Sequence, residues 1–172
     1  GLLTAGCSAH DGVGIVFEGT LSDPRRVEAA TAARPAPHTG VTTVLGPEAA
    51  FMNGLATHAF YLRGWIDPRN PRLHDAFQLV VRGRFQRRVY LDQAYAAGSR
   101  LKTVRIDAER VCGGGCIWYE TVGIDLSERD MEAYAGTGLA FAVTGRRDRV
   151  TVRVPPGYFE GFLAAHRRHR GG

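Results

Sequence analysis

A glycine-rich turn closed by two cysteines constrains this fold more than any other feature of the sequence. Residues 101–111 alternate between two sets of side chains, as a β-strand does, and residues 116–126 form its expected partner. Between them, the glycines of Cys112-Gly-Gly-Gly-Cys116 turn the chain, because glycine adopts positive φ angles readily. One side of the first strand carries paired opposite charges, typical of a strand with one face in water. The sequence therefore predicts an antiparallel hairpin here.

Other segments extend the β pattern. Further strands are expected over residues 13–17, 41–45, 57–66, 76–85, 88–92, 139–144 and 150–154. Ser127 and Asp130 form a capping-box pattern that opens a short helix to about Tyr134. An amphipathic helix is expected from Tyr158 to about His169. The fold class is thus mainly β: an antiparallel β-sandwich or an open barrel with a short helix and a C-terminal amphipathic helix.

The two cysteines of the turn admit several chemistries. A C-x3-C pair can be a disulfide, half of a metal site or a redox pair. A redox pair of the thioredoxin type has two intervening residues. A zinc site needs two more ligands, and His58 and His74 could supply them only if the fold happened to bring them to the pair. We predict a disulfide between Cys112 and Cys116, which fixes the turn and implies an oxidising compartment.

The first residues resemble the lipobox of bacterial lipoproteins. Ala5, Gly6 and Cys7 match its last three positions, and Thr4 stands where leucine is preferred. The resemblance implies acylation of Cys7, by palmitate or similar chains, and a membrane partner held through that anchor. It also implies a place in the bacterial cell envelope on the periplasmic side, and Ser8 is compatible with the outer membrane.

Length and composition complete the organisation. The chain of 172 residues is long enough for one compact domain, and its 44% hydrophobic residues are ordinary for a globular protein. We assign residues 1–7 to the lipobox-like segment, 8–56 to a Pro/Ala-rich tether that partly packs, and 57–172 to the β domain.

The formal net charge is +5, and basic residues concentrate only at the C-terminal end. Its sequence is His166-Arg-Arg-His169-Arg170. Three interpretations are open. The cations suit the negative end of the helix dipole, or they contact anionic lipid or lipopolysaccharide, or the two histidines hold a metal. We predict no metal, and no nucleic-acid partner, because a clustered basic stripe with aromatic residues is missing.

A candidate ligand-binding rim surrounds a proline-punctuated loop. It consists of Arg63, Trp65, Asp67, Arg69 and His74, an aromatic ring beside arginines and a carboxylate. The alternative is that the tryptophan belongs to the core or its edge, since aromatic side chains dominate the cores of small β domains.

No catalytic motif is present, so the sequence predicts neither an enzyme nor a cofactor. The strand carboxylates Asp107, Glu109 and Glu120 are explained by cross-strand pairing with arginine. We expect a lipid-anchored envelope protein, acting as a structural or accessory subunit through contacts with an envelope protein partner. The alternative is a small-ligand or glycan-binding periplasmic module that uses the Arg63–His74 rim.

Overall fold

Two β-sheets and a group of helices form the part of the chain that the computed structural model describes, residues 15–53 and 56–171. Within these residues the larger sheet has 8 strands and the smaller has 4. The larger sheet runs in the order β1 (Ile15–Phe17), β4 (Glu48–Asn53), β5 (Ala56–Ile66), β6 (Phe77–Phe85), β10 (Cys116–Leu126) and β9 (Thr103–Cys112). Beside β5, a further hairpin is formed by β3 (Thr42–Leu45) and β2 (Ala32–Pro35).

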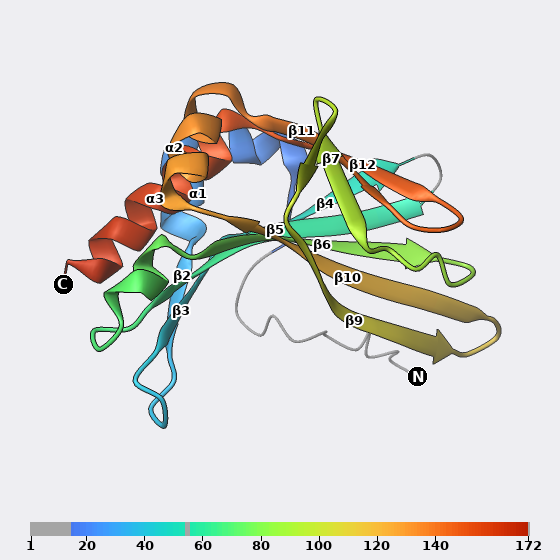
Figure 1. Cartoon of the computed structure of the whole chain (residues 1–172), viewed down its shortest axis with the longest axis horizontal. Coiled ribbons are helices and arrows are strands. Elements are labelled where there is room, and N and C mark those ends of the chain that lie inside the picture. The colour runs from blue at the N-terminus through green and yellow to red at the C-terminus, as the bar shows by residue number, and fades with distance from the viewer. Residues whose placement is uncertain (1–14, 54–55, 172) are drawn as a thin grey trace, which may run out of the picture.

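The smaller sheet packs on one face of the larger one (Figure 1). Its strands are β12 (Arg149–Val154), β11 (Leu139–Thr144), β7 (Gln93–Ala96) and β8 (Ser99–Leu101). All described strand pairs are antiparallel except β1 with β4. The predicted fold class is confirmed: the protein is mainly β, consistent with a β-sandwich, with a C-terminal helix.

The helices gather at one end of the sheets, away from the β9–β10 turn (Figure 1). The α-helices are α1 (Pro24–Ala30), α2 (Glu128–Thr137) and α3 (Pro156–Arg170). Two short 3-10 helices are η1 (Glu18–Ser22) and η2 (Pro71–Asp75). The predicted capping box at Ser127 and Asp130 is present at the start of α2.

Helix α3 closes the core at this end through Tyr158. The Tyr158 hydroxyl donates a hydrogen bond to the carbonyl oxygen of Pro47 (2.6 Å) and accepts one from the amide of Leu62 (3.0 Å). Burial raises the pKa of this phenol, so it stays protonated and able to donate. Phe159 and Phe162 are also buried, which confirms the predicted apolar stripe of the C-terminal helix.

Residues 15–53, the described part of the segment interpreted as a tether up to the gap at 54–55, pack more extensively than the sequence suggested. Leu21, Val27 and Val44 lie in the same core cluster as the two sheets. Helix α1 approaches α3 so closely that a Cβ atom on Gly161 would lie 2.2 Å from the carbonyl oxygen of Pro24. Only glycine fits at this crossing.

Two local expectations are wrong. Residues 88–92 do not form a strand; they lie in the loop between β6 and β7, where Tyr90 has a φ angle of 63°. Strand β9 does not have a single wet face, because Val104–Cys112 are exposed on both faces. The reason is that, in the part of the chain that the structure describes, neither the smaller sheet nor a helix covers this end of the larger sheet (Figure 1).

Candidate functional site

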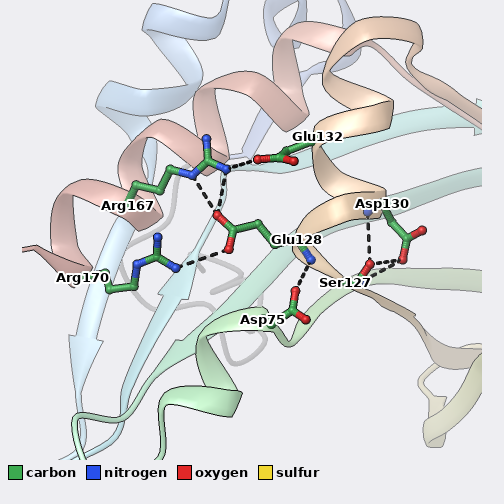
Figure 2. A network of polar contacts seen from close by, with 7 residues as sticks. All are labelled: Asp75, Ser127, Glu128, Asp130, Glu132, Arg167 and Arg170. Atoms are coloured by element: carbon green, nitrogen blue, oxygen red, sulfur yellow. Dashed lines mark hydrogen bonds and ion pairs between the residues drawn. The ribbon is translucent and has the colours of Figure 1, made fainter.

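The C-terminal arginines are largely occupied by intramolecular ion pairs. Arg167 contacts Glu128 (2.8 Å) and Glu132, and Arg170 contacts Glu128 (3.4 Å), so α3 is tied to α2 (Figure 2). Burial alone would raise the pKa of Glu128, but the hydrogen bond from Arg167 and the two nearby arginines hold it below its usual value. Arg168 pairs with Glu28 of α1. These contacts leave less positive charge for an anionic surface than the sequence alone suggests.

His166, at the start of this basic run, is a core residue. Its side chain is fully buried, its Nε2 lies 3.2 Å from the carbonyl oxygen of Trp65, and its ring meets that of Phe77 edge-on. Burial lowers the pKa of His166, which disfavours the charged form. Within the described residues there is no cluster of three or more metal-ligating side chains.

The predicted ligand-binding rim divides into two groups. Arg63 lies on the outer face of the larger sheet, where its guanidinium donates to Oε1 of Gln78 (2.9 Å). Gln78 in turn donates to Asp125 (2.8 Å), and Lys102 pairs with the same carboxylate (3.1 Å). The ring of Trp65 lies beside Arg63, with its centroid 5.3 Å from the guanidinium carbon. The polar and charged groups of this row therefore bind one another across neighbouring strands.

The remaining residues of that rim organise the loop after β5. The carboxylate of Asp67 accepts hydrogen bonds from the amide (3.0 Å) and Nε (3.3 Å) of Arg69. The hydrogen bond from the Arg69 amide lowers the pKa of Asp67, whereas burial raises it. The hydrogen bond has the larger effect, so the pKa is lowered. Arg69 also donates to the carbonyl oxygen of Thr39. His74 lies in η2, and its buried Nε2 has no partner among the described atoms.

The β9–β10 hairpin projects from the body of the molecule (Figure 1). Its predicted disulfide is confirmed: Cys112 and Cys116 are bonded and occupy paired positions at the turn. Val104, Ile106 and Val111 are exposed at 42%, 39% and 47%. Because this strand buries so little apolar surface, it is held by its ladder with β10 and by the disulfide at the turn.

The outer edge of β9 has no neighbouring strand among the described residues. Its inner edge pairs with β10, with a bulge where Asp107 pairs with Thr121 and Arg105 with Val122. Ile106 is the extra residue at this bulge. A free edge presents backbone N–H and C=O groups to other chains, and a bulge together with charged side chains limits unselective pairing. The outer edge of β9 can therefore pair with another strand, but the bulge and the charged side chains restrict which strands fit.

A cleft lies at the end of the sandwich opposite the helices. We call it the open-end cleft, and it comprises two cavities of about 610 and 380 Å³ that share Ala56, Phe85 and Asp148. The first is also lined by Arg84, Gln86, Arg87, Val89 and Ile117, and the second by Asn53, His58, Arg149 and Thr151.

His58 lies at the inner side of this cleft. Its Nδ1 accepts a hydrogen bond from the amide of Arg84 (3.0 Å), and its ring contacts those of Phe51 and Phe85. Burial lowers the pKa of His58, which the charge of Asp148 opposes and that of Arg84 reinforces. Above its pKa the ring is neutral and carries its proton on Nε2.

Arginines surround the open-end cleft. Arg84 near the end of β6, Arg87 in the β6–β7 loop and Arg149 at the start of β12 line it, and the adjoining loops carry Arg88, Arg146 and Arg147. None of them lies within ion-pair distance of a carboxylate in the described part of the chain. The guanidinium of Arg88 stacks 4.6 Å from the ring centroid of Tyr90 and 5.2 Å from that of Trp118, and Arg146 lies 5.2 Å from Tyr90.

Glu120 positions the loop that carries two of these arginines, Arg87 and Arg88. It is 3% exposed, and its carboxylate accepts hydrogen bonds from the amides of Val89, Tyr90 (3.0 Å) and Leu91 (2.7 Å). The expectation that arginine pairing explains Glu120 is therefore wrong. Its cross-strand neighbours are Gly83 and Ala108, whose small size leaves room for the loop.

The sequence alone does not predict this end of the molecule, because its parts are distant in the chain. The signal that it offers is the density of arginine in RGRFQRR (82–88) and GRRDR (145–149), where the pattern predicts a strand end and a hairpin turn. Periodicity predicts each element but not that both loops meet. A backbone hydrogen bond from Arg146 to Val89 (2.9 Å) joins them.

Comparisons with protein-family models, with curated proteins and with solved structures find no match to this chain. The class of protein is thus defined by its own geometry: a mainly β protein with a projecting disulfide-closed hairpin and an arginine-lined cleft. Among the described residues, no helix has the length and apolar character needed to cross a bilayer.

Proposed function

We propose that this protein is a lipid-anchored component of the bacterial cell envelope that binds a partner protein at the free edge of β9. The observation that carries the proposal is the edge itself: a strand of 10 residues, exposed over Val104–Cys112 and closed by a disulfide at its tip. Strand addition to such an edge supplies main-chain hydrogen bonds, while side chains provide selectivity. The role is one of binding rather than catalysis.

The side chains of β9 define the chemistry of the partner. Val104 and Ile106 offer exposed apolar surface, whereas Arg105, Asp107 and Glu109 offer charges of both signs. A complementary strand carries apolar residues opposite the first pair and opposite charges across from the others. The bulge near Ile106 rejects strands that need an uninterrupted ladder. The partner is therefore an extended segment of another envelope protein.

The membrane part of the proposal rests on the lipobox-like residues Ala5, Gly6 and Cys7, which lie outside the described residues. Acyl chains on Cys7 would hold the protein on the periplasmic side, with the outer membrane as the proposed location. Intact mass spectrometry of the protein extracted from host membranes tests this step. A chain that begins at acylated Cys7 supports the anchor, and an unmodified chain that retains residues 1–6 refutes it.

Site-directed photocrosslinking tests the contact. A photoreactive amino acid at Ile106, in the protein expressed in its own host, should give one discrete adduct, which the second substitution Val104→Lys abolishes. The matched control places the same group at Met52, an exposed apolar residue on β4 that is 62% exposed. The same adducts from both positions, or an adduct that tolerates Val104→Lys, would refute a contact at β9. Thermal unfolding of each variant verifies that it is folded.

A further inference from the structure

We infer that the open-end cleft binds one molecule of an anionic amphiphile, an apolar chain that ends in a phosphate group. This site is separate from the β9 edge and does not depend on a partner protein. Two observations carry it: an excess of unpaired arginine among the lining residues and an apolar wall beside them.

The charge at the cleft is unbalanced. Arg84 and Arg87 line the larger cavity, and Arg149 lines the smaller one, whereas Asp148 is the acidic residue that lines both. The carboxylate of Asp148 accepts a hydrogen bond from the amide of Arg149 (2.8 Å), so it is engaged with the backbone of its own turn. An anion that enters the cleft therefore meets several guanidinium groups that no carboxylate of the described chain neutralises.

The arginines that line the cleft supply the donors for an anion. They are Arg84 and Arg87 in the larger cavity and Arg149 in the smaller one. Guanidinium groups match the oxygens of phosphate, which arginine can bind through two parallel hydrogen bonds. Arg88, in the adjoining loop, lies over the rings of Tyr90 and Trp118 and is not a lining residue.

The apolar wall selects the rest of the ligand. The half-buried Ala56 and Ile117, backed by the buried Phe85 and Val89, line the same cavity as Arg84 and Arg87. Its volume of about 610 Å³ lies within the range of small-molecule sites. A hydrated ion such as inorganic phosphate would leave this wall exposed to water. An amphiphile covers the wall with its apolar chain and, in the same position, places its anionic end against the arginines.

Isothermal titration with dodecyl phosphate, below the concentration at which it forms micelles, tests the inference. We expect saturable binding at a stoichiometry of one, and no comparable binding of the uncharged amphiphile dodecyl maltoside or of inorganic phosphate. Binding of all amphiphiles alike would show a nonspecific apolar surface. Binding only to anionic phospholipid vesicles, and not to the monomer, would show a membrane contact instead. Either result overturns the inference.

Charge variants locate the site. Arg84→Gln with Arg87→Gln should weaken binding by about tenfold or more, since charge-assisted hydrogen bonds are lost. Asp148→Asn should tighten binding because it removes the acidic lining residue. Arg72→Gln, at an exposed arginine of η2 away from both cavities, is the matched control and should leave the affinity unchanged. Unaltered affinity in the double variant, with its thermal unfolding like that of the wild type, would contradict the assignment.

Discussion

Replacement of Glu120 by glutamine tests how the open end of the molecule is held in place. The wild-type carboxylate accepts hydrogen bonds from three successive backbone amides, those of Val89, Tyr90 and Leu91. Glutamine keeps the shape of the side chain but has one acceptor oxygen in place of two. Its amide nitrogen must face at least one of these N–H groups, which then has no acceptor.

The magnitude follows from burial. An unpaired donor in a buried site costs about 1–3 kcal/mol, and the hydrogen bonds that remain lose the strengthening supplied by the negative charge. Glu120 is only 3% exposed, so water does not compensate readily. We expect Glu120→Gln to lower the free energy of unfolding by about 3 kcal/mol. For a chain of this size the midpoint of thermal unfolding then falls by about 6–12 °C.

Chemical denaturation and differential scanning calorimetry measure this loss. Glu109→Gln is the matched control, because Glu109 is exposed on β9, and such surface substitutions change stability by about 0.5 kcal/mol or less. Hydrogen exchange should quicken most at the amides of residues 89–91. If Glu120→Gln were as stable as the control, the three hydrogen bonds would not organise the loop, and the reasoning would be wrong.

Three further predictions follow from buried or constrained groups. Tyr158→Phe leaves the Leu62 amide and the Pro47 carbonyl without their shared partner and should cost about 2–4 kcal/mol, measured by urea unfolding. Burial lowers the pKa values of His58 and His166, so the unfolded chain binds protons more readily, and stability should fall as the pH drops below about 6.5. Unfolding midpoints between pH 7.5 and 5.5 should show this slope in the wild type and less of it in His166→Gln. Serine at both Cys112 and Cys116 should cost no more than about 2 kcal/mol but should quicken exchange along β9; unchanged exchange would mean that the disulfide does not order the hairpin.

Local pattern was sufficient to predict much of the fold. Alternation and glycine placement predicted the β9–β10 hairpin, and the Ser127–Asp130 spacing predicted the start of α2. Both signals arise within a few residues, where the sequence acts directly on the backbone. The C-terminal helix was predicted for the same reason, because its apolar residues recur at helical spacing.

Features that depend on distant contacts were not predictable in this way. Residues 88–92 contain apolar side chains typical of a strand, but the Glu120 carboxylate accepts hydrogen bonds from the amides of residues 89–91 and holds them as a loop. The alternation in residues 101–111 implied a covered face, yet whether a second layer lies over a strand is decided elsewhere in the chain. The pairing of Arg167 and Arg170 with Glu128 likewise depends on how α2 and α3 meet (Figure 2). Predicted roles for Arg63, Trp65, Asp67, Arg69 and His74 in ligand binding stay predictions.

The most direct measurement of the central proposal is amide hydrogen exchange of this protein, alone and in complex with the partner identified by crosslinking at Ile106. Strand addition at β9 predicts that exchange slows by about tenfold or more within Thr103–Cys112, because free edge amides gain acceptors, while exchange in β4 is unchanged. A complex that forms with β9 exchanging as fast as in the free protein would contradict the proposal.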